Sequence, residues 1–173
     1  MAQKRPAHST AFALADAVEQ AVSLFRAAHP HAHISWNHDG SNLEAHVLAD
    51  PQQVQQVLLN LLKNALDAQV ENGNPQHPIG VLLHRENGAC TVAVRDTGCG
   101  LPAAQMARLF EPFFTTKTEG LGLGMSLSKS IIESFGGSLS AHANADAPGL
   151  TVWFRLPEDT GMEAHKENQE ETP

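Results

Sequence analysis

Three glycines alternate within residues 118–130, TEGLGLGMSLSKS, directly before an apolar pattern with helical spacing. Glycines that lead into a helix are typical of phosphate-binding loops, because free backbone N–H groups and the positive end of the helix dipole both favour an anion. The spacing matches neither the P-loop, G-x-x-x-x-G-K-[ST], nor the Rossmann turn, G-x-G-x-x-G. The sequence therefore predicts a phosphate-binding loop of another kind at Gly120, Gly122 and Gly124.

A second group of polar side chains repeats along residues 51–70, where Asn60, Asn64 and Asp67 follow one another at four- and three-residue steps. A helix would place all three on one face. Asn is a poor helix former, so two on one face indicate a ligand. An amide oxygen suits Mg²⁺, which prefers oxygen ligands and keeps several of its waters. A solvated helix face is the alternative, and for Asp67 it explains the pattern equally well.

A carboxylate closes the strand-like pattern ACTVAVRD, and the glycine turn TGCGLP follows it. Asp96 at this strand end can point into a pocket and select a ligand with a hydrogen-bond donor. Gly98 and Gly100 allow positive φ and a close approach of the backbone to that ligand. An ordinary turn Asp is the alternative interpretation. Cys99, between the two glycines, is interpreted as a bystander rather than as a redox sensor.

Periodicity predicts the elements that must position these residues. Helices are expected over 10–28, 51–70 and 125–135, with a short one over 102–109. The cap of the second helix is predicted at Asp50, with Pro51 at its first position. Strands are expected on both sides of an Asp39-Gly40 turn and of an Asn87-Gly88 hairpin. The expected strands are HAHISWNH, LEAHVL, IGVLLHRE, ACTVAVRD, GSLSAHAN and LTVWFRLP.

Composition limits the class of protein. The 173 residues carry a net charge of −8 and 42% hydrophobic residues, as expected for one globular domain. The acidic balance argues against nucleic acid as a partner. The sequence shows neither an apolar run of membrane-spanning length nor a signal peptide, and it has two cysteines, so we expect a cytoplasmic domain without membrane contact. We expect a flexible segment over 1–9, one domain over 10–157, and a disordered polar tail over 158–173.

Four motifs occur in one order along the chain: NLLKNALDA, DTGCGLP, FEPFFTTK and GLGLGMSLS. In this order they resemble the N, G1, F and G2 boxes of the catalytic ATP-binding domain of sensor histidine kinases, which belongs to the wider GHKL group. The resemblance covers residues 10–157. It implies a Bergerat-type α/β sandwich of two layers, in which three helices cover one face of a mixed, mainly antiparallel sheet. ATP would lie between the helical layer and a mobile lid.

The resemblance also implies roles for particular residues. Asn64 would hold Mg²⁺ between the ATP phosphates, and Asp96 would accept a hydrogen bond from the adenine amino group. Lys117 would approach a phosphate, with a solvated lysine as the alternative, and Thr151 would reach the adenine, although a strand position explains a Thr almost as well. Asn60, Asn64 and Lys117 are the expected catalytic residues. The residues expected to bind ATP or ADP are Asn60, Asn64, Asp67, Asp96, Gly98, Gly100, Lys117, Gly120, Leu121, Gly122, Leu123, Gly124 and Thr151.

Phe110, Phe113 and Phe114 stand in the loop that would form the lid. Three aromatic side chains so close together must either join the core or dock the lid onto bound ATP, and the resemblance implies docking for at least one. Little sequence separates Lys117 from Gly120, so we expect a compact lid. His29, His31 and His33 alternate nearer the N-terminus, but they lack a Cys or carboxylate at ligand spacing, so a polar strand face is favoured over a metal site.

The residue one helical turn before Asn64 bears on what receives the γ-phosphate. ATPases of the GHKL group carry a Glu there that activates water, whereas this chain has Asn60, whose amide cannot act as a general base. The resemblance therefore implies a protein-histidine kinase. The expected partners are a separate dimerisation domain that carries the acceptor His, absent from this chain, and the receiver domain of a response regulator. A nucleotide-binding regulatory module without phosphate transfer and a GHKL-type ATPase are the alternatives.

Overall fold

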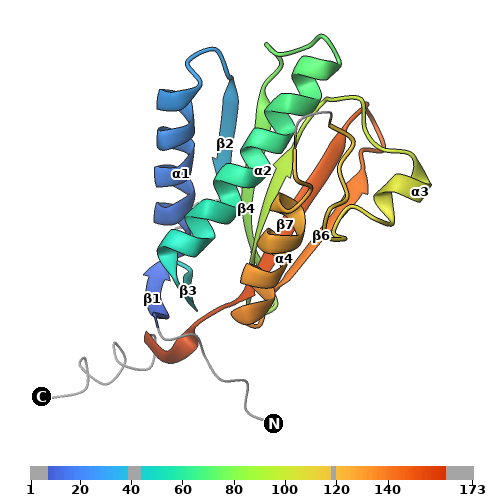
Figure 1. Cartoon of the computed structure of the whole chain (residues 1–173). Coiled ribbons are helices and arrows are strands. Elements are labelled where there is room, and N and C mark those ends of the chain that lie inside the picture. The colour runs from blue at the N-terminus through green and yellow to red at the C-terminus, as the bar shows by residue number, and fades with distance from the viewer. Residues whose placement is uncertain (1–7, 39–43, 118–119, 163–173) are drawn as a thin grey trace, which may run out of the picture.

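The protein is a two-layer α/β sandwich in which helices cover one face of a sheet (Figure 1). The structure, a computed structural model, describes residues 8–38, 44–117 and 120–162. Its main sheet has five strands in the order β2 (Ile34–His38), β4 (Ile79–Glu86), β5 (Ala89–Arg95), β7 (Leu150–Pro157) and β6 (Ser138–Ala143). The β2–β4 pair is parallel and the other pairs are antiparallel. The predicted fold class is confirmed.

The helical layer consists of α1 (Leu14–Ala28), α2 (Pro51–Glu71) and α4 (Gly124–Ser134). Helix α2 lies between the other two and packs on both. Its start follows from the sequence, because the Asp50 side chain accepts hydrogen bonds from Gln52 N at 2.9 Å and Gln53 N at 3.3 Å. One face of α2 is buried against the sheet and α1, which leaves its polar face toward α4. The buried residues are Val54, Val57, Leu58, Leu61, Leu62, Ala65 and Gln69.

The N-terminal region differs from the prediction in two ways. Residues 10–13 form a strand, β1 (Thr10–Ala13), rather than the first turn of a helix, and β1 pairs with β3 (His46–Ala49) in a separate two-stranded sheet. Strands β2 and β3 are not partners of one another, although both had been expected around one turn. The spacing of apolar residues over 10–13 fits both periods, so it could not separate strand from helix. The Asp39-Gly40 turn lies outside the described residues.

The loop that follows β5 contains a short helix, α3 (Ala103–Met106), within the expected range 102–109. The hairpin between β4 and β5 turns at Asn87 and Gly88, both with positive φ, as predicted. Alternate side chains of the central strands fill the core beneath the helices. They include Val81 and Leu83 on β4, Val92 and Val94 on β5, and Phe154 and Leu156 on β7.

The segment after β7 continues along β3 before a 3₁₀ turn over Thr160–Met162. Glu158 bridges to Val47, and Asp159 N donates to His46 O at 2.8 Å. Residues 158–162 therefore pack on the domain, where a polar tail was expected from residue 158. The remainder of that tail, and most of the expected segment 1–9, lie outside the described residues.

Candidate functional site

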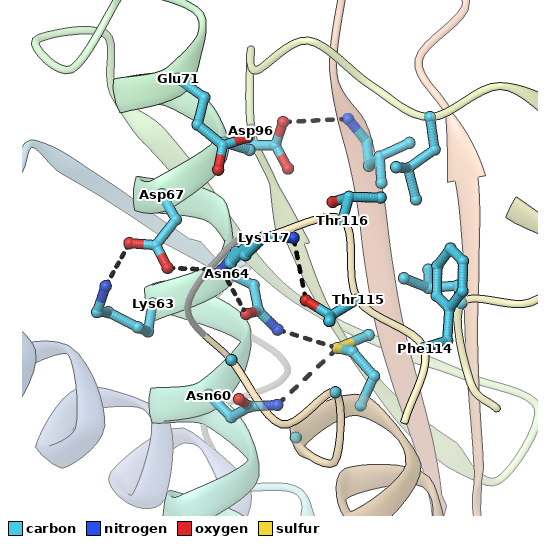
Figure 2. A pocket seen from close by; sticks show the side chains of 18 of the residues that line it. Asn60, Lys63, Asn64, Asp67, Glu71, Asp96, Phe114, Thr115, Thr116 and Lys117 are labelled. Carbon is cyan, nitrogen blue, oxygen red and sulfur yellow. Dashed lines mark hydrogen bonds and ion pairs between the residues drawn. The ribbon is translucent and has the colours of Figure 1, made fainter. Parts of the chain in front are cut away.

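A cavity of about 510 Å³ opens beside the polar face of α2. Its walls come from α2, the turn after β5, the loop over 109–117 and the glycine segment that leads into α4 (Figure 2). Segments far apart in the sequence thus meet at one place. The predicted site residues that line the cavity are Asn60, Asn64, Asp67, Asp96, Gly100, Lys117, Gly120, Leu121, Gly122, Leu123 and Gly124. Gly98 and Thr151 are not among its lining residues.

Asp96 forms the buried end of the cavity, with 5% of its surface exposed. Its Oδ1 accepts hydrogen bonds from Gly98 N at 2.8 Å and from Leu150 N at 3.2 Å. Among the described residues no donor is recorded for Oδ2, so that oxygen can accept from a ligand. Burial raises the pKa of the Asp96 carboxyl above its ordinary value, and the two backbone hydrogen bonds offset part of that rise.

Two glycines let the backbone close around Asp96. A Cβ on Gly98 would lie 2.5 Å from Ala68 Cβ on α2, so only glycine lets the turn pack on that helix. Gly149 has φ of +104°, and a Cβ there would lie 2.4 Å from Asp96 O. Gly98 was predicted as a binding residue, and that role stays a prediction; in the structure it packs on Ala68. Gly149 was missed, and the dipeptide Pro148-Gly149 before a strand is the signal that marks it as a turn.

Thr151 acts on this end of the cavity through a neighbour. Its Oγ1 donates to Asn144 Oδ1 at 2.7 Å, and Asn144 Nδ2 donates to Asp96 O at 2.8 Å. The Thr hydroxyl therefore helps to fix the backbone of Asp96 from the adjacent strand end. Asn144 was not identified from the sequence, because its bond to Asp96 spans 48 residues.

The other end of the cavity is polar and carries charges of both signs. Lys117 Nζ donates to Asp67 Oδ2 at 2.6 Å and to Asn64 Oδ1 at 3.2 Å. Lys63, one turn before Asp67 on α2, forms an ion pair with Asp67 Oδ1. Burial alone would raise the pKa of Asp67, but the hydrogen bonds and charges of Lys117 and Lys63 outweigh it and lower the pKa below its ordinary value.

Asn60 joins α2 to α4. Its Nδ2 donates to Ser128 Oγ at 3.0 Å, and Ser128 is 3% exposed. A Cβ on Gly124 would lie 2.6 Å from Asn60 Oδ1, so glycine is needed where α4 begins against α2. Met125 lies over both amides, with its Sδ 3.1 Å from Asn64 Nδ2 and 3.9 Å from Asn60 Nδ2. Ser128 and Met125 were not predicted, since each lies more than 60 residues from its partner.

The start of α4 presents backbone donors to the cavity. Leu123 provides no side-chain cap, so the N–H groups of the first turn are left for a ligand. Gly122 has φ of +65°, and a Cβ there would lie 2.6 Å from the Phe113 backbone, so the close approach of this segment to the loop requires glycine. These features fit an anion, as the glycine spacing had predicted.

The three phenylalanines of the loop have three different environments. Phe110 packs on the core, with the Lys129 ammonium 5.5 Å from its ring centre. Phe114 lines the cavity. Phe113 is 75% exposed and has φ of 66°. Phe110 thus joins the core, as one predicted alternative had it, while docking of the lid onto ATP stays a prediction. The predicted compactness of the lid depends on residues 118–119, which lie outside the described residues.

The residues present fit a nucleotide with a hard divalent cation. A buried carboxylate with one oxygen left for a donor suits the amino group of a base, and amide oxygen, ammonium and helix N–H groups suit phosphates. Among the described residues there is no cluster of three or more His, Cys, Asp or Glu that could hold a metal ion. No helix within 8–38, 44–117 and 120–162 is long and apolar enough to span a bilayer.

Relatives in sequence are sensor proteins. Sensor protein FixL of Bradyrhizobium diazoefficiens is 40% identical over 147 residues, which make up 85% of this chain and 26% of that protein. Sensor histidine kinase ZraS of Escherichia coli strain K12 is 37% identical over 111 residues, which make up 64% of this chain and 23% of that protein. This chain thus spans about a quarter of the length of these curated relatives.

Solved structures of the same shape include the catalytic domain of histidine kinase ThkA in a nucleotide-free form, with a TM-score of 0.75, 28% identity, and coverage of 87% of this chain and 95% of that one. Full-length ShkA in complex with AMPPNP matches with a TM-score of 0.73 and 25% identity over 92% of this chain and 33% of that one. Residues 49–160, more than half of the chain, match the model of one protein family, and this range contains the site residues described above. The chain belongs to the family of histidine kinase-, DNA gyrase B- and HSP90-like ATPases.

Proposed function

We propose that this chain is the catalytic ATP-binding part of a sensor histidine kinase, and that it transfers the γ-phosphoryl group of ATP to a His on a separate dimerisation domain. One observation carries the proposal: a single cavity joins the buried Asp96 carboxylate at one end to the amide face of α2 and the start of α4 at the other. The likeness to FixL and ZraS supports the sensor-kinase assignment.

The buried end of the cavity suits adenine. Asp96 Oδ2 accepts a hydrogen bond from the adenine amino group, while Oδ1 stays bonded to Gly98 N and Leu150 N. Guanine presents a carbonyl oxygen at that position, which would face the carboxylate without a shared proton. A buried polar group left unpaired in this way costs binding free energy, so the site prefers adenine over guanine.

The polar end of the cavity suits the triphosphate. Asn64 Oδ1 is the ligand that this chain offers to Mg²⁺, which neutralises phosphate charge when bound. The N–H groups at the start of α4 would hold phosphate oxygens, and Lys117 adds a positive charge beside them. Together these groups orient the γ-phosphorus toward the open side of the cavity, where an acceptor can approach.

The neighbourhood of Asn60 favours a protein acceptor over water. The Asn60 amide donates a hydrogen bond to Ser128 and lies against Gly124. An amide cannot remove a proton from water. The imidazole nitrogen of an acceptor His needs no such base. The ring nitrogen that carries the lone pair attacks the γ-phosphorus and an N–P bond forms. The bond to the bridging oxygen breaks, ADP leaves with that electron pair, and the proton on the other ring nitrogen passes to solvent. The expected partners are thus the His-bearing dimerisation domain and, after it, the Asp of a response-regulator receiver domain, in the cytoplasm.

Titration calorimetry with ATP, with and without Mg²⁺, tests the nucleotide site. We expect binding that is strengthened by Mg²⁺ and weakened by Asp96→Asn, while the surface variant Asp146→Asn binds as the wild type does. Incubation of the chain with radiolabelled ATP and its cognate His domain then tests transfer. Absence of ATP binding, or binding insensitive to Asp96→Asn, would contradict the nucleotide site, and binding without any labelled His domain would contradict the kinase assignment.

A further inference from the structure

A protein cation already lies on the amide oxygen that the proposed function gives to Mg²⁺. The Lys117 ammonium donates to Asn64 Oδ1 at 3.2 Å, and this contact joins the loop to α2 across the cavity (Figure 2). The Lys117 side chain is 30% exposed, so it is partly withdrawn from water. The two residues are 53 positions apart in the sequence, so the sequence pattern around either of them does not predict the contact.

Asp67 holds this ammonium in place. Asp67 Oδ2 accepts from Lys117 Nζ at 2.6 Å, while its other oxygen pairs with Lys63. The backbone of Lys117 is bonded as well, because Lys117 N donates to Thr115 Oγ1 at 3.1 Å. Charge-assisted hydrogen bonds of this kind are stronger than neutral ones. Asp67 thus acts on Asn64 through Lys117, as a positioning residue.

We propose that Lys117 competes with Mg²⁺ for Asn64, so that the Asp67–Lys117 pair sets how strongly nucleotide binding depends on the divalent cation. This inference rests on the proposed function, because it takes Asn64 as the Mg²⁺ ligand. Without Mg²⁺, the ammonium supplies the positive charge that faces the phosphates. When Mg²⁺ arrives with the nucleotide, the ammonium leaves Asn64 Oδ1, because two cations on one amide oxygen repel one another.

The flexible stem of lysine makes the exchange feasible. Its ammonium is a compact charge with three donors on four methylene groups, so it can leave Asn64 and reach a phosphate oxygen while the loop stays in place. An arginine would keep the charge. A methionine would keep much of the length and remove the charge. These two substitutions separate the charge of Lys117 from its packing.

The test is calorimetric titration with ADP, which binds without any transfer step, over a series of free Mg²⁺ concentrations. The two quantities measured are the ADP affinity in EDTA and the free Mg²⁺ concentration at half-maximal enhancement. Binding of Mg²⁺ to ADP in solution is the same for all variants, so differences between variants report the protein. Lys63→Met is the matched control, because it removes a lysine from the same carboxylate without touching Asn64.

For Lys117→Met we expect ADP affinity in EDTA to fall about tenfold, and the Mg²⁺ midpoint to fall about fivefold, the scale of one charge-assisted hydrogen bond. Lys117→Arg and Lys63→Met should keep a Mg²⁺ midpoint within about twofold of the wild type. A midpoint in Lys117→Met that is unchanged or higher would overturn the competition.

Asp67→Asn separates positioning from simple electrostatics. It keeps the Lys117 charge but removes what holds that charge on Asn64, so competition predicts a lower Mg²⁺ midpoint. Loss of a nearby negative charge would by itself raise the midpoint, and that result would overturn the positioning role. Failure of the proposed function looks different, since ADP binding would then be absent or insensitive to Asp96→Asn in every variant.

Discussion

At the scale of single residues, Asp96 shows how a binding group can oppose folding. Its carboxylate is buried, and burial raises its pKa, so the ionised form that a ligand needs is also the form that the fold disfavours. Its two backbone hydrogen bonds converge on one oxygen and leave the other for the ligand. Stability and affinity should therefore change in opposite directions when this side chain is altered.

Asp96→Asn should weaken ATP binding by about tenfold or more, the effect of one hydrogen bond to a charged group, without loss of stability in the ligand-free protein. An Asn oxygen can still accept from Gly98 N and Leu150 N, and the buried charge is gone. Calorimetry gives the affinity and urea unfolding gives the free energy of unfolding. A variant that is clearly less stable than the wild type at neutral pH would contradict this account.

The buried Asp96 carboxyl also gives stability and ATP affinity a pH dependence of defined sign. The folded pKa of Asp96 lies above the ordinary value of 3.8, so its contribution to stability is fully present below that value and is lost as pH rises through the raised pKa. The stability of Asp96→Asn relative to the wild type should thus increase from acid to neutral pH. ATP affinity of the wild type should fall as pH drops through the same pKa, because the carboxyl protonates. Urea unfolding and calorimetry at several pH values measure the two effects.

At the scale of elements, the contact between α2 and α4 sets the shape of the cavity. The bond from Asn60 Nδ2 to the buried Ser128 Oγ ties the helices together, and Gly124 gives α4 room to begin against Asn60. Asn60 had been expected as a catalytic residue on the strength of its place before Asn64. Its contacts with Ser128 and Gly124 support a role in holding the start of α4 against α2.

A double-mutant cycle of Asn60→Ala and Ser128→Ala should give a coupling free energy of about 1 kcal/mol, typical of one hydrogen bond between side chains. The cycle of Asn60→Ala with Ser130→Ala is the control, because Ser130 bonds within its own helix, to Ser126 O. Urea unfolding of the six proteins supplies the free energies. Equal coupling in both cycles would mean that the Asn60–Ser128 bond does not join the helices.

The turn before β7 offers a second test at this scale. Gly149→Ala should lower the free energy of unfolding by more than about 2 kcal/mol, because it combines positive φ with a steric overlap on Asp96 O. Gly73→Ala is the matched control, since Gly73 has φ of +70° with nothing within 4 Å of the added Cβ, and should cost about 1 kcal/mol. Thermal or urea unfolding gives both free energies. Equal losses of stability in the two variants would show that the overlap with Asp96 O adds nothing to the cost of positive φ.

The helices and strands also show which parts of the fold could be predicted from the sequence. The cap at Asp50, the buried stripe of α2 and the Asn87-Gly88 hairpin depend on neighbours in the chain, and all three were predicted. Strand β1 was missed, because its partner β3 decides between strand and helix where the local spacing allows both. Tertiary pairing overrides local propensity in such cases.

For the candidate site, too, local features could be predicted from the sequence and long-range contacts could not. Motif spacing predicted half of the residues that line the cavity, since each motif lies within one short segment. The contacts of Lys117 with Asn64, of Asn60 with Ser128 and of Gly149 with Asp96 could not be predicted, because they join segments that only the packing of α2, α4 and β7 brings together. Which group contacts which is a property of the assembled layers.

At the scale of the whole molecule, the segment after β7 is fastened to the rest by an ion pair. The side chain of Glu158 is 6% exposed and accepts from the Arg85 guanidinium of β4, with the Nη2–Oε1 distance at 2.5 Å and Nε–Oε2 at 3.0 Å. Two parallel hydrogen bonds of this type are the strong form of an ion pair.

Arg85→Gln should lower the free energy of unfolding by about 2 kcal/mol, because it leaves a buried carboxylate without its partner; the partial exposure of Arg85 makes the loss smaller than for a fully buried pair. Asp146→Asn, which breaks the exposed pair with Arg95, is the control and should have little effect. Urea unfolding measures both. A loss in Arg85→Gln no larger than in the control would show that the pair does not fasten this segment.

The short strand β3 lies between the entry and the exit of the described domain, since it pairs with β1 on one side and contacts Glu158 and Asp159 on the other. A pulling force on these two ends would therefore act first across this small ribbon (Figure 1). Asp96 and Gly149 lie directly beside strands β5 and β7, which belong to the other sheet. Force along the chain would thus first strain β1 and β3, which contribute no residue to the wall of the cavity.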